Sequence, residues 1–379
     1  MEAVNAIELK GVTKRFGDVI ANDNVNLTVR KGEILSILGE NGSGKTTLMN
    51  MLSGIYFPDE GEIRVDGKEV TIRSPKDSFA LGIGMIHQHF KLINILTAAE
   101  NIILGLPGKE KLNMKQIEKE IKELTDQYGF DLNPAQKIYD MSVSQKQTVE
   151  IVKVLYRGAD ILILDEPTAV LTPQETEKLF AVLRNMRKAG KSIIIITHKL
   201  NEVLELSDRV AVLRKGKYID TVETADATVE SLTEMMVGEK VTLDINRTDP
   251  KAPEKRIEMR GITCRNKEGM KVLKEASFTA CSGEILGVAG ISGSGQKELL
   301  ESVAGLQPIE SGEIFYFSPE GETMKISDMK AEEIKNLGIT LSFVPEDRLG
   351  MGLVGSMDLT DNMMIRSYKE GKHFFADRK

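Results

Sequence analysis

The residues best suited to chemistry lie in a glycine-rich run, residues 39–46, which reads Gly-Glu-Asn-Gly-Ser-Gly-Lys-Thr. Glycines at this spacing let the backbone curl so that successive N–H groups point at phosphate oxygens. A short apolar run, residues 34–38, precedes the loop, and a helical pattern over 46–54 follows it, so the positive end of a helix dipole adds to the site. We therefore predict that Lys45 contacts the β- and γ-phosphates of a nucleotide and that Thr46 offers a hydroxyl to Mg²⁺. The flanking strand and helix disfavour the alternative, a chance glycine-rich turn.

A second copy of this loop appears later in the chain, and it is damaged. Residues 290–297 read Gly-Ile-Ser-Gly-Ser-Gly-Gln-Lys, so Gln296 replaces the lysine and Lys297 replaces the threonine. The surrounding sequence repeats at the same offset, because Gly-Glu-Ile-Leu at 32–35 returns at 283–286. We expect one intact and one degenerate nucleotide site, arranged in tandem.

Two adjacent carboxylates follow another apolar run, residues 161–164. Asp165 ends this predicted strand, where it can hold Mg²⁺ through water. Glu166 comes next and can polarise an attacking water, and general-base help of this kind is worth roughly 10²–10⁴-fold in rate. The alternative is an ordinary acidic strand end, which the intact phosphate loop makes the weaker interpretation.

Four further signals are weaker. Residues 142–145 form a helix start that could bind an anion, although by spacing alone a plain N-cap is the better interpretation. Gln88 could bond a metal-bound water or a γ-phosphate, but a lone glutamine carries no meaning without context. His198 follows an apolar run and could contact the γ-phosphate or simply end a strand. Phe16 could stack on adenine, which is worth about 1–3 kcal/mol by analogy with base stacking, or belong to the core.

The rest of the chain alternates strand-like and helix-like patterns. Residues 7–29 alternate apolar and polar in patches, which predicts antiparallel strands. The runs 161–164 and 193–196 predict strands buried on both faces, with a helix over 174–188 between them. A further helix over 113–128 carries one apolar stripe. Strands that alternate with helices predict a parallel sheet covered on both sides.

The repeat divides the chain of 379 residues into domains. We predict a first domain at 1–240, a polar linker with two prolines at 241–256, and a second domain at 257–379. At the spacing of the first unit, the counterpart of Met141 would lie beyond the last residue. The second domain is therefore expected to be incomplete at its C-terminus.

Composition excludes several classes of function. The net charge of −7 argues against a general nucleic-acid binder, which needs a basic face. Two cysteines without metal-type spacing fit a reducing compartment. The start of the chain lacks the pattern of a signal peptide, and no uncharged apolar run approaches membrane-spanning length. We expect a soluble chain whose membrane role, if it has one, runs through a partner.

Taken together and in order, these residues resemble an ATP-binding cassette (ABC) ATPase. The resemblance implies two tandem α/β P-loop NTPase domains. Each would have a mixed or parallel sheet core, an antiparallel β subdomain and a helical subdomain. ATP and Mg²⁺ are the implied ligands. The implied ATP-binding residues are Phe16, Gly39, Glu40, Asn41, Gly42, Ser43, Gly44, Lys45, Thr46 and Thr47. The implied signature residues are Ser142, Val143, Ser144 and Gln145. Glu166, His198 and Gln88 are implied in catalysis, and Thr46, Gln88 and Asp165 in metal binding.

The degenerate second loop and Val-Pro-Glu-Asp-Arg at 344–348 resemble the carbohydrate-uptake branch of that family. Residues 165–175 and 85–90 look most like the members of that branch assigned to nucleoside or simple-sugar uptake. This implies a peripheral ATPase at the cytoplasmic face of the membrane, bound to transmembrane permease subunits and served by an extracytoplasmic solute-binding protein. It also implies pairing through the tandem ATPase domains. The alternative, a tandem ABC ATPase that acts on ribosomes, is disfavoured by the short, charge-mixed linker and by Gln296.

Two departures from the family pattern matter. Ser144 stands where the signature normally carries glycine, and its side chain could crowd a phosphate. Family geometry also sandwiches each ATP against the other domain's signature, and 257–379 contains none, so we expect Mg-ATP binding with poor turnover. A groove beside Gln88, lined by Phe90, Leu92 and Leu96, is the expected docking site for a permease helix.

Overall fold

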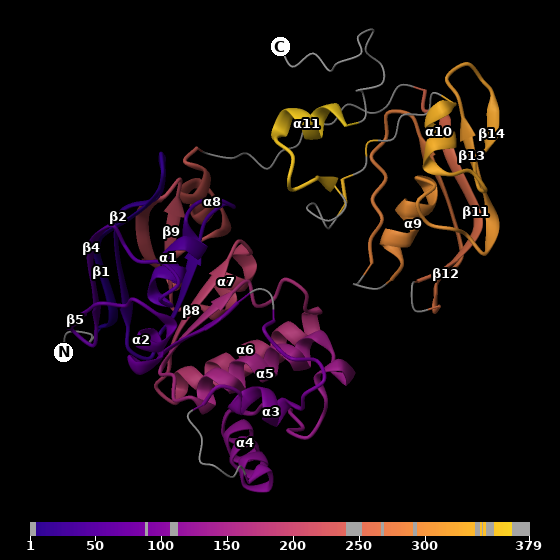
Figure 1. Cartoon of the computed structure of the whole chain (residues 1–379). Coiled ribbons are helices and arrows are strands. Elements are labelled where there is room, and N and C mark those ends of the chain that lie inside the picture. The colour runs from indigo at the N-terminus through magenta and orange to yellow at the C-terminus, as the bar shows by residue number, and fades with distance from the viewer. Residues whose placement is uncertain are drawn as a thin grey trace. The chain divides into compact units, whose positions relative to one another are not determined.

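The computed structural model divides into two compact units, Met1–Ile245 and Asn246–Lys379, and each is described by itself (Figure 1). It describes residues 5–87, 90–106, 113–239, 252–266, 269–290, 294–337, 342, 344–345 and 352–365. The predicted Gln88 and most of the run 344–348 lie outside these residues.

A six-stranded mixed sheet forms the centre of the first unit, in the order β10-β9-β3-β8-β7-β6. Its strands are β3 (Ile34–Leu38), β6 (Ile83–Ile86), β7 (Ile161–Asp165), β8 (Ser192–Thr197), β9 (Arg209–Arg214) and β10 (Lys217–Glu223). All neighbours are parallel except β9 and β10. Every residue of β3, β7 and β8 is buried, which explains why these strands are uninterrupted apolar runs. The predicted parallel core is confirmed for this unit.

An antiparallel sheet in the order β2-β1-β4-β5 accompanies the central sheet. Its strands are β1 (Asn5–Phe16), β2 (Val19–Arg30), β4 (Glu60–Val65) and β5 (Lys68–Val70). The helix α1 (Lys45–Leu52) shares one apolar cluster with both sheets, in which Leu48 and Leu52 join Ile7 of β1 and Ile163 of β7. The helix that follows the glycine-rich loop is therefore fixed by both sheets.

The helical part of the first unit gathers on one side of it, apart from the antiparallel sheet (Figure 1). Its helices are α3 (Ala98–Ile103), α4 (Met114–Tyr128), α5 (Val143–Tyr156) and α6 (Pro173–Lys188). The predicted stripe on α4 is confirmed, since Ile121 and Tyr128 are buried and Ile117 and Leu124 pack against the same cluster. The shorter helices are α2 (Pro75–Ala80), α7 (Leu200–Leu206), α8 (Val229–Val237) and the 3₁₀ turns η1 (Ile138–Asp140) and η2 (Thr224–Asp226). No helix within the described ranges is long and apolar enough to cross a membrane.

The second unit repeats the antiparallel sheet of the first, in the order β12-β11-β13-β14. Its elements are β11 (Lys255–Arg265), β12 (Lys271–Cys281), β13 (Ser311–Phe317), β14 (Thr323–Lys325), α9 (Gln296–Val303), α10 (Ala331–Asn336) and α11 (Leu359–Met364). The repeat extends to the loop before the helix. Gly295 precedes α9 in the left-handed conformation (φ 89°), as Gly44 precedes α1 (φ 96°).

The parallel sheet and helical subdomain expected in the second unit do not appear among its described residues. Residues 284–290, the counterpart of β3 and the start of its loop, form no strand, and Ile285 is 86% exposed. A parallel strand needs neighbours from distant parts of the chain. None runs beside this segment in the described part of the unit.

Candidate nucleotide site

The loop between β3 and α1 has a shape that requires glycine at two positions. A Cβ atom on Gly44 would lie 2.4 Å from the carbonyl oxygen of Ala21 and 2.7 Å from Nδ2 of Asn22. A Cβ on Gly39 would lie 2.3 Å from the carbonyl oxygen of Leu213. Because the loop packs this closely on β2 and β9, its backbone is held in place before any ligand binds.

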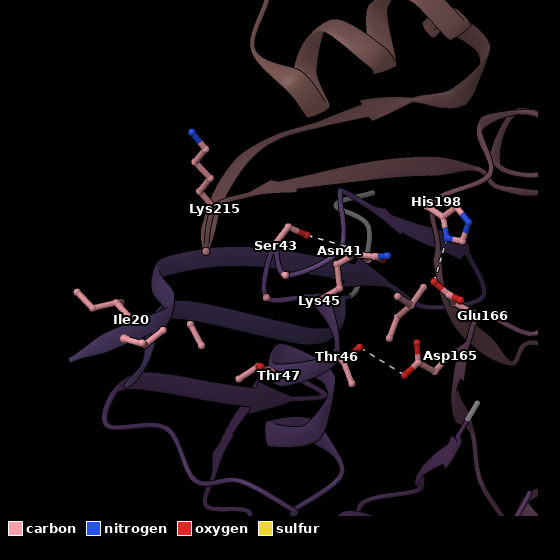
Figure 2. Close-up of a pocket in the computed structure, with 16 residues that line it drawn as sticks. Ile20, Asn41, Ser43, Lys45, Thr46, Thr47, Asp165, Glu166, His198 and Lys215 are labelled. Atoms are coloured by element: carbon pink, nitrogen blue, oxygen red, sulfur yellow. Dashed lines mark hydrogen bonds and ion pairs between the residues drawn. The ribbon is translucent and has the colours of Figure 1, made fainter. Parts of the chain in front are cut away.

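A pocket of about 700 Å³ opens over this loop (Figure 2). It collects residues from the ends of β3, β7 and β8, where ligands bind in open α/β sheets. The lining residues are Val19, Ile20, Ala21, Asn41, Gly42, Ser43, Gly44, Lys45, Thr46, Thr47, Asp165, Glu166, Ile196, His198, Lys215 and Gly216. The predicted phosphate loop, carboxylates and histidine thus meet in one place.

Lys45 lies at the centre of the loop and is 6% exposed. Its Nζ donates to the carbonyl oxygens of Gly39 (2.7 Å) and Glu40 (2.8 Å) and lies 3.4 Å from Oγ of Ser43. Burial lowers the pKa of the ammonium, and the nearby Glu166, Asp165 and Glu40 carboxylates oppose that shift. A buried cation ringed by backbone oxygens can exchange these partners for phosphate oxygens.

Asp165 and Thr46 face each other across the pocket floor, with 3.5 Å between Oδ2 and Oγ1 (Figure 2). Burial raises the pKa of Asp165, and the adjacent Glu166 carboxylate raises it further. The hydrogen bond from the Thr46 hydroxyl and the charge of Lys45 oppose this rise in the pKa of Asp165. One carboxylate and one hydroxyl are the kind of hard oxygen donors that hold Mg²⁺ together with phosphate and water oxygens. The residues present therefore fit this ion.

Glu166 and His198 form a pair beside the same floor. The distance from Glu166 Oε1 to His198 Nδ1 is 2.9 Å, and Figure 2 shows both side chains at the edge of the pocket. The Glu166 side chain is 19% exposed and that of His198 is 51% exposed. Glu166 also has a left-handed backbone, φ 46°, which non-glycine residues adopt at a cost. This arrangement can place a carboxylate and an imidazole against a water molecule in the pocket.

Phe16 does not line the pocket. It ends β1, is 43% exposed and meets Tyr56 edge-on, with ring centroids 5.1 Å apart. The Lys14 ammonium lies 5.5 Å from the ring centroid. Val19, which pairs with Phe16 in the β1–β2 hairpin, does line the pocket. The Phe16 ring therefore lies near the pocket rim.

Three of the four predicted signature residues, Ser142, Ser144 and Gln145, line a different pocket of about 660 Å³, between the end of α4 and the helices α5 and α6, whereas Val143 does not. Ser142 is the N-cap of α5. Its Oγ accepts from the Gln145 N–H at 3.2 Å, and its own N–H donates to Gln145 Oε1 at 2.9 Å. Within this chain the segment is a capping box, which is the plainer of the two interpretations of its sequence.

Several residues of the site escape sequence reasoning. Asn22 of β2 is fully buried and donates from Nδ2 to the Gly44 carbonyl oxygen at 3.2 Å. The β9–β10 hairpin turn supplies Lys215 and Gly216, and the Gly216 N–H donates to the Ser43 carbonyl oxygen at 3.1 Å. These contacts join segments far apart in the sequence, so no local pattern announces them.

Comparison with known proteins identifies the family. The model of the ABC transporter family matches residues 22–169, which include the loop and both carboxylates. The chain is 45% identical to the nucleoside import ATP-binding protein NupA of Lactococcus lactis, over 98% of this chain and 73% of that protein. This chain belongs to the ABC transporter ATP-binding family.

Other relatives agree with this assignment. The chain is 44% identical to the guanosine import ATP-binding protein NupO of Bacillus subtilis, over 96% of this chain and 70% of that protein. A solved ATP-binding cassette, MJ1267 in its ADP conformation, has a TM-score of 0.54 at 27% identity and covers 62% of this chain and 96% of its own. The chain is therefore a nucleotide-binding ATPase of this family. Relatives named for import give no support to the ribosomal alternative.

Proposed function

We propose that this chain is the ATP-hydrolysing subunit of an importer for nucleosides or simple sugars. The observation that carries the proposal is the 45% identity to a nucleoside import protein over 98% of the chain. A ribose import ATP-binding protein of Clostridium perfringens is 38% identical over the whole chain, so nucleosides are favoured over sugars. As a peripheral protein of the cytoplasmic membrane face, the subunit would bind permease subunits that receive solute from an external binding protein.

The pocket supports a division of labour for in-line attack of water on the γ-phosphate, in which positioning and charge stabilisation supply most of the rate. Lys45 and the N–H groups of residues 39–46 neutralise and orient the phosphates. Thr46 and Asp165 would hold Mg²⁺, which when bound would supply positive charge to offset that of the phosphates. Glu166 accepts the proton of the attacking water. His198 lies 2.9 Å from the Glu166 carboxylate and orients that carboxylate. Gln88, which lies outside the described residues, keeps its proposed role as a sensor of the γ-phosphate.

We further propose that the second unit contributes a weak nucleotide site, with domain boundaries at 1–240 and 257–379 and a linker at 241–256. Gln296 Nε2 donates to the Val288 carbonyl oxygen at 3.0 Å. The uncharged amide thus bonds one carbonyl of the segment before its loop, whereas the Lys45 ammonium bonds two carbonyls of the loop itself. Pairing of tandem domains fits the family, in which the cassette MJ0796, 29% identical with a TM-score of 0.51, is known as a dimer.

Capture of the tagged full chain from detergent-solubilised native membranes tests the assignment. We expect multi-span membrane proteins to co-purify, identified by mass spectrometry. Co-purification of ribosomal proteins without a permease would overturn the importer assignment but not the ATPase assignment.

Uptake of radiolabelled nucleosides, pentoses and hexoses by a deletion strain then tests the substrate class. We expect nucleoside uptake to return, at the low rate that poor turnover allows, with the wild-type chain and with the exposed control Glu177→Gln, but not with Glu166→Gln. Restoration of sugar uptake alone would contradict the nucleoside assignment.

A further inference from the structure

Two residues outside the pocket converge on the turn that carries Glu166. We propose that Gln147 and Lys199 are positioning residues that hold the turn Glu166–Thr168, in which Glu166 is left-handed, and so aim the Glu166 carboxylate. The inference rests on the proposed role of Glu166 as the base.

The turn needs such support because its backbone is strained. Glu166 has φ 46°, a conformation that costs a non-glycine residue free energy and persists only where surrounding contacts over-determine it. One such contact comes from the sheet, since the Glu166 N–H donates to the Ile196 carbonyl oxygen at 2.9 Å. A second lies within the turn, where the Ala169 N–H donates to the Glu166 carbonyl oxygen at 3.2 Å.

Gln147 supplies the next contact from α5. Its Nε2 donates to the Pro167 carbonyl oxygen at 2.7 Å, and the side chain is buried, at 4% exposure. A buried carbonyl without a hydrogen-bond partner costs free energy. The Gln147 amide therefore stabilises the buried position of the Pro167 carbonyl. Gln147 lies two residues beyond the predicted signature, so the bond ties that helix to the catalytic turn.

Lys199 supplies the fourth contact. Its Nζ donates to the carbonyl oxygen of Thr168 at 3.0 Å and lies 3.1 Å from the Thr168 hydroxyl. Glu202 holds the ammonium at 2.9 Å and also accepts from the Thr168 hydroxyl, which fixes both partners. Because Lys199 directly follows His198, the same tether restrains the histidine that faces Glu166.

Three successive carbonyls, those of Glu166, Pro167 and Thr168, are therefore occupied by donors from the turn, from α5 and from the segment after β8. Without the amide or the ammonium, the turn can relax toward the ordinary helical region. The carboxylate then leaves its place 2.9 Å from His198 Nδ1. Misplacement of a reacting group by about 1 Å can cost as much as 10²-fold in rate.

The test uses the near-isosteric variants Gln147→Met and Lys199→Met in the full chain, with single-turnover ATP hydrolysis as the readout. We expect the rate to fall about tenfold in each, equal to about 1.4 kcal/mol of barrier. ATP affinity should stay close to wild type, and Lys199→Arg, which keeps a donor, should recover most of the rate. The exposed controls Gln127→Met and Lys188→Met should leave it unchanged.

A double-mutant cycle separates positioning from a general structural role. In a Glu166→Gln background, Gln147→Met should lower the residual rate no further, because residues that act through one group are not additive. If Glu166→Gln abolishes turnover but Gln147→Met does not change the wild-type rate, the positioning role is refuted. If Glu166→Gln leaves turnover intact, the proposed role of Glu166 fails instead.

Amide hydrogen exchange gives a readout that does not depend on turnover. We expect faster exchange over residues 165–172 in Gln147→Met and in Lys199→Met, with the strand β8 unaffected. Unchanged exchange over 165–172 in both variants would overturn the proposal.

Discussion

Replacing Asp165 by asparagine should stabilise the ligand-free protein while weakening its use of Mg²⁺. Asp165 is 8% exposed, and the Glu166 carboxylate is its neighbour in the chain. Asparagine has the same shape, keeps an oxygen for the Thr46 hydroxyl and removes a buried negative charge. Removing such a functional charge typically gains about 1–2 kcal/mol of unfolding free energy, or roughly 2–8 °C in melting temperature for a unit of this size.

The gain should depend on pH in a defined direction. Burial, and then Glu166, raise the pKa of Asp165 in the folded protein above its usual value. The folded state of the wild type therefore holds its proton more tightly than the unfolded chain, whose aspartates titrate near about 3.9. Wild-type stability falls as pH rises from there through the raised folded pKa. The advantage of Asp165→Asn should be near zero below that window and complete at neutral pH.

Thermal unfolding of both proteins at several pH values, with and without Mg-ADP, measures these effects. Asp160→Asn is the matched control, because this exposed carboxylate precedes the same strand and pairs with Lys191 at 2.7 Å. It should give no stabilisation. In Asp165→Asn, the extra stabilisation that Mg²⁺ adds to ADP should be lost. The electrostatic account would be refuted if Asp165→Asn were less stable than wild type at neutral pH. It would also be refuted if the gain in unfolding free energy did not depend on pH.

Two further predictions concern the nucleotide contacts. Phe16→Leu should weaken ATP binding about tenfold but leave tripolyphosphate binding unchanged, because stacking acts on the base alone. Isothermal titration with both ligands measures this, and Phe57→Leu is the exposed control. Equal losses for both ligands would contradict a stacking role. Gly44→Ala should abolish ATP binding, since its Cβ meets backbone 2.4 Å away, whereas Gly42→Ala, whose Cβ meets nothing within 4 Å, should cost only about 1 kcal/mol of backbone strain. Equal defects in the two alanine variants would show that close packing is not the reason for glycine at position 44.

The sequence predicts most of what local chemistry determines. The loop 39–46 and the pair Asp165 and Glu166 follow buried strands, so their spacing alone places them at one edge of the sheet, and the structure brings them together. The apolar runs of β7 and β8 identify buried parallel strands for the same reason. The catalytic roles assigned to these residues remain predictions.

Contacts between distant segments could not be predicted. Asn22, Gln147 and Lys199 carry ordinary side chains in ordinary patterns, and their importance appears only when β2, α5 and the start of α7 fold against the loops. At Ile285, by contrast, the sequence predicts a strand that the structure does not form. The run there has the sequence of a buried strand, but such a strand forms only where neighbours lie beside it.

The left-handed backbone at Glu166 also limits how this site can change over evolutionary time. Single base changes in glutamate codons lead to Gly, Asp, Ala, Val, Lys and Gln. Among these, Gly and Asp most readily adopt a positive φ such as the 46° found here, and Val does so least. Where hydrolysis at this site is no longer selected, mutation to Gly would therefore remove the carboxylate and relax the chain in one step, and mutation to Asp would relax the chain while it draws the carboxylate back by one methylene. Decay of the catalytic centre is then accompanied by a gain in stability, and only continued selection for transport opposes it.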